Sequence, residues 1–329
     1  MNFAEHNILS PTRVDLSGGT LDCWPIYSLV DNDCLTINFS IGVYSQVKIS
    51  KNNKIHIHLV DFNYKAEFSE LIDVLSSQDE ELNLLKCVLS YYKPNFGFKL
   101  EVKTQSPVGA GLGGSSSLMI SLLKAFDKIN HITRSLNELV HLAHNLEAFV
   151  IQAPTGTQDY YPAALTGLHG IHYQPQGISL ESLPIPQNII NEHCTLVYTG
   201  CPHHSGINNW QVIKSVVEKN KEVLDALKGI NQISHQMFSA IKSSNWTEVP
   251  ILMEKEMKFR LQLTPYFTNS VINDLVKEAK DAGALSVKIC GAGGGGCVFI
   301  WSDINNKVKV DQLCEKLGFT ILPLQLSNQ

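Results

Sequence analysis

The sequence predicts an α+β protein with two domains, residues 1–185 and 186–329. In each half, segments that alternate apolar and polar side chains come first and segments with helical spacing follow. This order favours α+β over a strictly alternating parallel sheet. The length of 329 residues corresponds to two domains of the common size of ~150 residues. Hydrophobic residues make up 44% of the chain and charged residues only 17%, so a sizeable core can form.

The first half is predicted to begin with strands and to continue with two helices. Alternating patterns rich in Ile and Val predict strands with one solvated face over residues 33–49, 54–60 and 96–103. Residues 115–129 place apolar side chains at helical spacing. Residues 135–151 form the second predicted helix, in which Ser135 and Glu138 have the spacing of a capping box.

The second half is predicted to start after a stretch that is rich in turn-forming residues. Residues 174–188 concentrate Pro, Gly, Gln and Ser, which makes them the predicted domain junction. Beyond them, residues 193–200 are predicted to form a strand and residues 206–282 mostly helices. Residues 285–302 are predicted to form two short strands around a run of glycines.

A glycine-rich segment, SPVGAGLGGSSS at 106–117, lies between a predicted strand and a predicted helix. Glycines let the backbone turn sharply and let an anion approach the amides, and the first turn of a helix offers unpaired N–H groups. These features predict a phosphate cradle made by Pro107, Gly109, Ala110, Gly111, Leu112, Gly113, Gly114, Ser115 and Ser116. The hydroxyls of Ser115, Ser116 and Ser117 are candidate helix caps, and one of them is a candidate Mg²⁺ ligand.

Three known types of phosphate loop compete for this segment. A Walker A loop requires a lysine after its last glycine, and none is present. Gly109, Gly111 and Gly114 satisfy GxGxxG, but a dinucleotide-binding fold expects an early βαβ unit, and here about a hundred strand-rich residues come first. Protein kinases use the same glycine spacing, yet the sequence contains neither an HRD nor a DFG triplet.

Two further segments, taken together with the glycine loop, indicate the family to which it belongs. Residues 10–22, SPTRVDLSGGTLD, place a cation, two glycines and a carboxylate close together, and residues 288–297, KICGAGGGGC, form a second glycine-rich turn. In this order, the three segments resemble the signature of the GHMP kinases, the superfamily of galactokinase, homoserine kinase, mevalonate kinase and phosphomevalonate kinase. The resemblance covers essentially the whole chain.

The resemblance implies a fold and a place for each ligand. It implies an N-terminal domain of ribosomal-protein-S5 type and a C-terminal ferredoxin-like domain. ATP would lie with its phosphates over the 107–117 loop, and the acceptor would lie in the cleft between the domains. The 288–297 turn would shape that cleft, with Gly293 and Gly294 as candidate substrate contacts. The alternative for this turn is a tight hairpin that packs the two domains together.

The resemblance also implies catalytic roles. A helix carboxylate of the family helps to hold the metal, and an aspartate some dozen residues later faces the acceptor hydroxyl. Glu147 matches the first, with Ser115 as the second Mg²⁺ ligand, and Asp159 matches the second as the candidate general base. Arg13 matches the basic position of the first motif and would stabilise the developing oxygen anion or orient Asp159. The alternative for Arg13 is a simple ion pair within its own segment.

The acceptor is predicted to be a sugar or a sugar phosphate. Asp22 matches a carboxylate that binds sugar hydroxyls in galactokinase-like members, and Gly18, Gly19 and Asp22 resemble the GGGTD pattern of heptose 7-phosphate kinases. Galactokinases carry an acidic residue and a histidine where this chain has Gly19, Thr20 and Leu21, which disfavours galactose. A mevalonate-type kinase and a non-catalytic nucleotide or sugar sensor remain as alternatives.

The composition and charge of the chain limit the kinds of partner that the protein can bind. With 26 basic and 31 acidic residues the net charge is -5, which argues against a nucleic-acid-binding protein. No apolar run reaches the ~18 residues of a membrane span, and no signal peptide is visible at the N-terminus. The eight cysteines show no CxxC spacing, which is typical of reduced thiols. We therefore expect a cytoplasmic protein with a small-molecule substrate, and a homodimer is compatible with the sequence.

Overall fold

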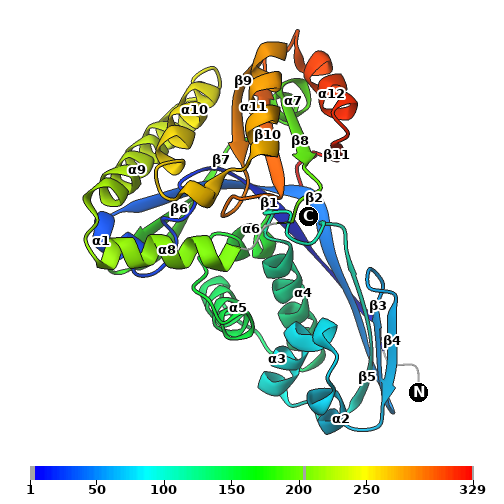
Figure 1. Ribbon diagram of the computed structural model, residues 1–329. Coiled ribbons are helices and arrows are strands. Elements are labelled where there is room, and N and C mark those ends of the chain that lie inside the picture. The colour runs from blue at the N-terminus through cyan, green and yellow to red at the C-terminus, as the bar shows by residue number, and fades with distance from the viewer. Residues whose placement is uncertain (1–3, 203–204, 328–329) are drawn as a thin grey trace.

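The computed structural model describes residues 4–202 and 205–327, and it contains two sheets in separate parts of the molecule (Figure 1). The first sheet comprises β1 (His6–Ser17), β2 (Cys34–Asn52), β3 (Ile55–Leu59), β4 (Tyr64–Phe68), β5 (Gly97–Thr104), β6 (Leu168–Gln174) and β7 (Gly177–Leu183). The second comprises β8 (Cys194–Tyr198), β9 (Ala284–Ile289), β10 (Cys297–Ser302) and β11 (Thr320–Leu322). The predicted α+β class is thus confirmed.

Strand β2 organises the first sheet. β1 pairs with β2 along one edge, while β5 and β6 pair with different halves of its other edge. Most neighbours are antiparallel, and β3 runs parallel to β5. Only the C-terminal half of β2 alternates buried and half-buried side chains. Residues 34–41 are buried on both faces, which corrects the expectation of a solvated face along the whole strand.

The helices of the first region cover one face of this sheet (Figure 1). They are α1 (Ile26–Val30), α2 (Leu71–Ser76), the 3₁₀ turn η1 (Glu80–Leu82), α3 (Asn83–Tyr92), α4 (Gly114–Ile129), α5 (Leu136–Ile151) and α6 (Tyr160–Ala164). α4 packs on β1 and β2, and α5 and α6 pack on α4. The predicted capping box of α5 is confirmed, because Ser135 and Glu138 exchange hydrogen bonds at its first turn.

The second sheet has the strand order β11-β8-β10-β9, and every pair in it is antiparallel. Helices connect β8 to β9 and β10 to β11, which gives the split βαβ arrangement expected for a ferredoxin-like domain. The helices of this half are α7 (Gln187–His193), α8 (Ser205–Val217), α9 (Lys221–Lys242), α10 (Val249–Arg260), the 3₁₀ turn η2 (Pro265–Phe267), α11 (Ser270–Ala282) and α12 (Lys307–Lys316). The predominance of helix over 206–282 is confirmed.

The two regions share a hydrophobic core. α9 and α10 pack against β1 and β2, and Phe39 of β2 meets Phe299 of β10 edge to face, with ring centroids 6.0 Å apart. Functional side chains from the two halves are therefore held in fixed relation. Among the described residues, no helix combines the length and the apolar character that crossing a bilayer requires.

The stretch 174–188, which was expected to be a domain junction rich in turns, contains a regular strand. Residues 177–183 form β7, which pairs with β6 as a hairpin of the first sheet. Pro175 and Gln176 form the hairpin turn and Gly177, with φ +142°, begins β7 directly after it, so the turn-forming residues of this stretch mark a change of strand as well as the approach to α7.

Candidate active site

A cavity of about 430 Å³ lies where the two regions meet. Its walls come from β1, the 107–117 segment, α4, α5 and the loop before α6, together with Asn209 of α8, Arg260 of α10 and the turn at Gly291 and Ala292. The three segments that the sequence singled out therefore meet at one cavity, although they are far apart in the chain.

The 107–117 segment, called the phosphate loop from here on after its expected role, has an unusual backbone. Gly109, Gly111 and Gly113 have φ values of +67°, +74° and +71°, and they alternate with Ala110 and Leu112. Alternating left- and right-handed residues turn successive N–H groups toward the same side, which makes a concave anion-binding nest. Side chains beyond glycine rarely adopt such φ values, so the glycine spacing is a requirement of this shape.

The carbonyl groups of the phosphate loop are hydrogen-bonded to its surroundings. Ala110 O accepts from the backbone N–H of Cys297 at 2.7 Å, so the second glycine-rich turn docks on the loop. Gly111 O accepts from Arg13 Nη1 at 2.6 Å, and Leu112 O accepts from the backbone N–H of Arg13 at 3.0 Å. Because these carbonyls are engaged, an anion in the nest meets N–H groups rather than repelling oxygens.

The predicted serine caps of α4 were wrong. The helix begins at Gly114, and the residue before it, Gly113, has no side chain with which to cap. Ser115 Oγ instead donates to Glu147 Oε1 at 2.6 Å, and Ser117 Oγ donates to the carbonyl of Ser10 at 2.7 Å. The first amides of α4 are consequently left without a side-chain partner, as a helix N-terminus that binds a phosphate requires.

Arg13 is buried in β1 and connects Asp159 to the phosphate loop. Its Nε and Nη2 lie 2.8 and 2.7 Å from Asp159 Oδ1, while Nη1 donates to Gly111 O. Asp159, directly before α6, keeps 26% of its side chain exposed and lines the cavity. A Cβ built on Gly113 would lie 3.3 Å from Asp159 Oδ2, so the carboxylate touches the loop. The ion pair within the N-terminal segment is not formed, because Asp15 pairs elsewhere.

Glu147 of α5 lies on the cavity wall beside Ser115 and is 4% exposed. Its Oε1 accepts from Ser115, whereas its buried Oε2 has no hydrogen-bond partner among the described residues. Burial raises the pKa of this carboxyl above its usual value. A carboxylate beside a hydroxyl on a cavity wall suits Mg²⁺, which typically takes one or two carboxylates and completes its shell with water and phosphate. Within the described ranges no set of three or more His, Cys, Asp or Glu side chains forms a metal cage.

Asp22 holds the loop that leads to Asp159. Its Oδ1 accepts from the N–H of Thr20 and its Oδ2 from the N–H of Gln158, each at 3.1 Å. A Cβ on Gly156 would lie 1.6 Å from Asp22 Oδ2, so only glycine fits at that position. Burial, and then the negative charge of Asp159, raise the pKa of Asp22 to about 6.

Several predicted site residues lie behind the cavity wall rather than on it. The wall does not include Gly18, Gly19, Leu112, Gly293 and Gly294. Gly18 packs against the backbone of β2 and Gly19 against the side chain of Arg260. Gly293 and Gly294 pack against the backbone carbonyls of residues 266–267, so the second glycine turn contributes Gly291 and Ala292 to the cavity in their place.

A buried ionic cluster beneath the cavity was not anticipated. Arg260 Nη1 lies 3.1 Å from Asp15 Oδ2, and Lys288 Nζ lies 2.7 Å from Glu256 Oε2 and 3.5 Å from Asp15 Oδ2. Burial alone would raise the pKa of Asp15, but the charges of Lys288, Arg260 and Arg13 lower it to about 2. Arg260 also donates to Gly291 O at 2.8 Å, so the cluster fixes the cavity turn relative to β1. No spacing signal could reveal it, since its members come from β1, α10 and β9.

Comparison with known families identifies the class of protein to which this two-domain fold belongs. The family model described as "GHMP kinases N terminal domain" matches residues 83–167, and the one described as "GHMP kinases C terminal" matches residues 237–320. The chain belongs to the GHMP kinases, ATP-dependent enzymes that phosphorylate hydroxyl groups of small molecules.

Individual relatives differ in their acceptors. The chain is 28% identical over 287 residues to a mevalonate kinase of Thermococcus sibiricus, covering 79% of each protein. It is 25% identical over 317 residues to a D-glycero-alpha-D-manno-heptose 7-phosphate kinase of Campylobacter jejuni, covering 93% of this chain and 92% of the relative. The structure of Lactococcus lactis galactokinase complexed with galactose superposes with a TM-score of 0.81 at 18% identity, covering 98% and 94%. These similarities leave the specific substrate unassigned.

Proposed function

We propose that this protein transfers the γ-phosphate of ATP, with Mg²⁺, to a hydroxyl of a sugar or sugar phosphate, and that a heptose 7-phosphate-like acceptor is favoured. One observation carries the proposal. A single guanidinium, that of Arg13, binds both the carboxylate of Asp159 and the phosphate loop at Gly111. The candidate base is thereby held against the loop on which the terminal phosphate would lie.

The residues around the loop supply what phosphoryl transfer needs. The nest and the first amides of α4 bind the phosphates of the nucleotide. Both Arg13 nitrogens that contact Asp159 lie on Oδ1, so Oδ2 is left to accept the proton of the acceptor hydroxyl. Ser115 and Glu147 would hold Mg²⁺, which when bound neutralises negative charge on the β- and γ-phosphates. Asp22 keeps the loop of Asp159 in place through Gln158.

The charges around the cavity support a sugar over mevalonate. The described cations on its wall are Arg13 and Arg260, and they are paired with Asp159 and Asp15. The carboxylate of mevalonate would therefore approach Asp22 and Asp159 without a free cation to balance it. A longer polyol can present neutral hydroxyls to Asp22, whose oxygens have further lone pairs to accept from them, but its terminal phosphate meets no free cation on this wall either and must lie away from Asp22 and Asp159.

An acceptor panel tests this proposal. Heptose 7-phosphate, galactose and mevalonate are each supplied with ATP and Mg²⁺, and ADP release is measured for the wild-type protein and for Asp159→Asn. We expect turnover with heptose 7-phosphate that is lost in the variant. Turnover with mevalonate alone would support the mevalonate-type alternative. The similarity to the mevalonate kinase of Thermococcus sibiricus, at 28% identity, favours that alternative. Nucleotide binding without turnover of any acceptor would support the sensor.

A further inference from the structure

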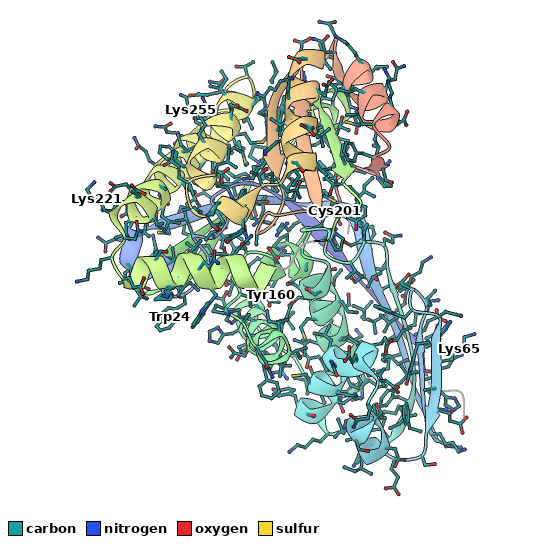
Figure 2. All side chains as sticks on the ribbon, in the orientation of Figure 1. Trp24, Lys65, Tyr160, Cys201, Lys221 and Lys255 are labelled. Carbon is teal, nitrogen blue, oxygen red and sulfur yellow. The ribbon has the colours of Figure 1, made fainter. Side chains whose placement is uncertain are left out.

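Two buried oxygen atoms near the cavity lack hydrogen-bond partners. Tyr160, the first residue of α6 and the one after Asp159, is 0% exposed, and its Oη has no partner among the described residues. Glu147 Oε2 is likewise buried and has no hydrogen-bond partner among the described residues. Figure 2 shows Tyr160 in the middle of the molecule, whereas Lys65 and Lys221 lie at its periphery. Burying a polar group without a partner destabilises the folded state, so two such groups together require an explanation.

The two groups are neighbours. α5 packs against α6, and the ring of Tyr160 meets that of His144 edge to face, with centroids 6.1 Å apart. Glu147 follows His144 by three residues, so both side chains lie on the same face of α5. After burial, the charge of Glu147 and hydrogen bonding to it are the largest causes that raise the pKa of Tyr160. The hydroxyl of Tyr160 thus lies beside the carboxylate of Glu147, close enough for the two groups to shift each other's pKa as hydrogen-bonding partners, although no hydrogen bond of regular geometry joins them.

Packing alone does not account for the hydroxyl. Phenylalanine would fill the same space without burying an unpaired oxygen. The next residue, Tyr161, shows the usual solution, because its buried ring brings the hydroxyl to Asn137 Oδ1 at 3.2 Å. The hydroxyl of Tyr160 therefore points to a state of the protein in which Glu147 Oε2 accepts its hydrogen.

We propose that Tyr160 is a positioning residue for the metal site: its hydroxyl donates to Glu147 Oε2 when Mg²⁺ is bound, which keeps Oε1 beside Ser115 and facing the cavity. Carboxylates that bind metals are commonly oriented by such an outer hydrogen bond. The inference rests on the proposed function, because it assumes that Glu147 and Ser115 hold the ion. Tyr160 itself touches neither the nucleotide nor the acceptor in this scheme, since it lies outside the cavity wall.

The test compares Tyr160→Phe with Tyr161→Phe, which removes a hydroxyl from the adjacent buried ring. Mn²⁺ affinity in the presence of ADP is measured by electron paramagnetic resonance, and metal-free ADP affinity by calorimetry. We expect Tyr160→Phe to weaken Mn²⁺ binding about 10-fold or more, the range for lost outer hydrogen bonds, with metal-free ADP affinity unchanged. Tyr161→Phe should leave both affinities unchanged. In a Glu147→Gln background, Tyr160→Phe should cause no further loss.

The outcomes separate this inference from the function on which it rests. Mn²⁺ affinity equal in Tyr160→Phe and wild type would overturn the role of Tyr160 and leave the kinase proposal standing. An equal loss in Tyr161→Phe, or an undiminished loss in the Glu147→Gln background, would overturn it as well. If the wild-type protein with ADP binds no Mn²⁺ at all, the metal site of the proposed function fails, and the role of Tyr160 fails with it.

Discussion

Arg13 places two nitrogens on one oxygen of Asp159, at 2.8 and 2.7 Å, and a third nitrogen on the carbonyl of Gly111. The planar guanidinium is suited to this, because its donors point in fixed directions. Arg13 and Asp159 are 146 residues apart in the chain, so their contact fixes the start of α6 relative to β1 and the phosphate loop. The following predictions test the parts of this arrangement separately.

Asp159→Asn should lower kcat by at least ~100-fold, the lower range for loss of a general base, while ATP affinity stays near that of the wild type. Asparagine keeps an oxygen for Arg13 but cannot accept the acceptor's proton. Steady-state kinetics and nucleotide calorimetry give both values. Asp127→Asn is the matched control, because Asp127 also pairs with an arginine, Arg134, but away from the cavity. Wild-type turnover in Asp159→Asn would exclude this residue as the base.

Arg13→Lys should retain the fold and lose turnover by ~10- to 100-fold. One ammonium group cannot contact Asp159 and Gly111 in the same fixed directions, and small misplacement of a catalytic group is costly. The measurement is kcat alongside thermal unfolding. The control is Arg134→Lys, which weakens the comparable pair with Asp127. If Arg13→Lys turns over as fast as the wild type, the bridging geometry is not needed for catalysis.

Gly111→Val should abolish nucleotide binding. At φ +74° a β-branched side chain is strained, and relief of that strain would change the backbone of the nest. Gly318→Val carries the same kind of backbone strain at φ +83°, but with nothing within 4 Å of an added Cβ and far from the cavity wall. ATP affinity is measured for both variants. Unaltered affinity in Gly111→Val, or an equal loss in Gly318→Val, would count against the nest.

The KM for the acceptor should depend on pH because of the Asp22 carboxyl. With a pKa of about 6, the carboxyl gains a proton as the pH falls below that value and loses capacity to accept hydrogen bonds from hydroxyls. The KM for the acceptor should therefore rise below pH 6 in the wild type. In Asp22→Asn the KM should be higher throughout and should not change over that range. A flat wild-type profile would show that Asp22 does not contact the acceptor.

The Asp22 carboxyl should also make the free energy of unfolding depend on pH. Its pKa in the folded state, about 6, exceeds the ordinary value of 3.8, so it favours folding at low pH. That contribution, roughly 3 kcal/mol at 1.36 kcal/mol per pH unit, is present below pH 4 and is lost as the pH rises through 6. Urea unfolding of wild type and Asp22→Asn should show the wild type losing stability relative to the variant between pH 4 and 7. A constant difference would contradict the raised pKa.

Lys288→Met should destabilise the protein by about 3–5 kcal/mol, because it leaves Asp15 and Glu256 buried with Arg260 as their remaining cation. Lys309→Met on α12 is the control, since Lys309 is exposed and has no ion pair within the described residues. Denaturant unfolding reports both changes. A loss below ~1 kcal/mol in Lys288→Met would mean that the cluster contributes little to stability.

Local patterns were sufficient for much of the fold. Period-two alternation predicted β2, β3 and β5, and helical spacing with a capping box predicted α4 and α5. Strand β1 gave no such signal, because Arg13 and Asp15 interrupt its apolar pattern. Both are buried there only because charged partners from distant segments surround them.

The sequence by itself determined the family and the glycine positions of the phosphate loop, because a nest of backbone amides depends on residues that are contiguous in the chain. The tertiary structure alone decided which side chains meet that loop. Ser115 turns to Glu147 instead of capping its helix, Asp22 reaches the amide of Gln158, and Tyr160 lies beside Glu147. Such contacts join segments that are brought together by packing of the two sheets. The local spacing of residues therefore cannot predict which buried oxygen faces which donor.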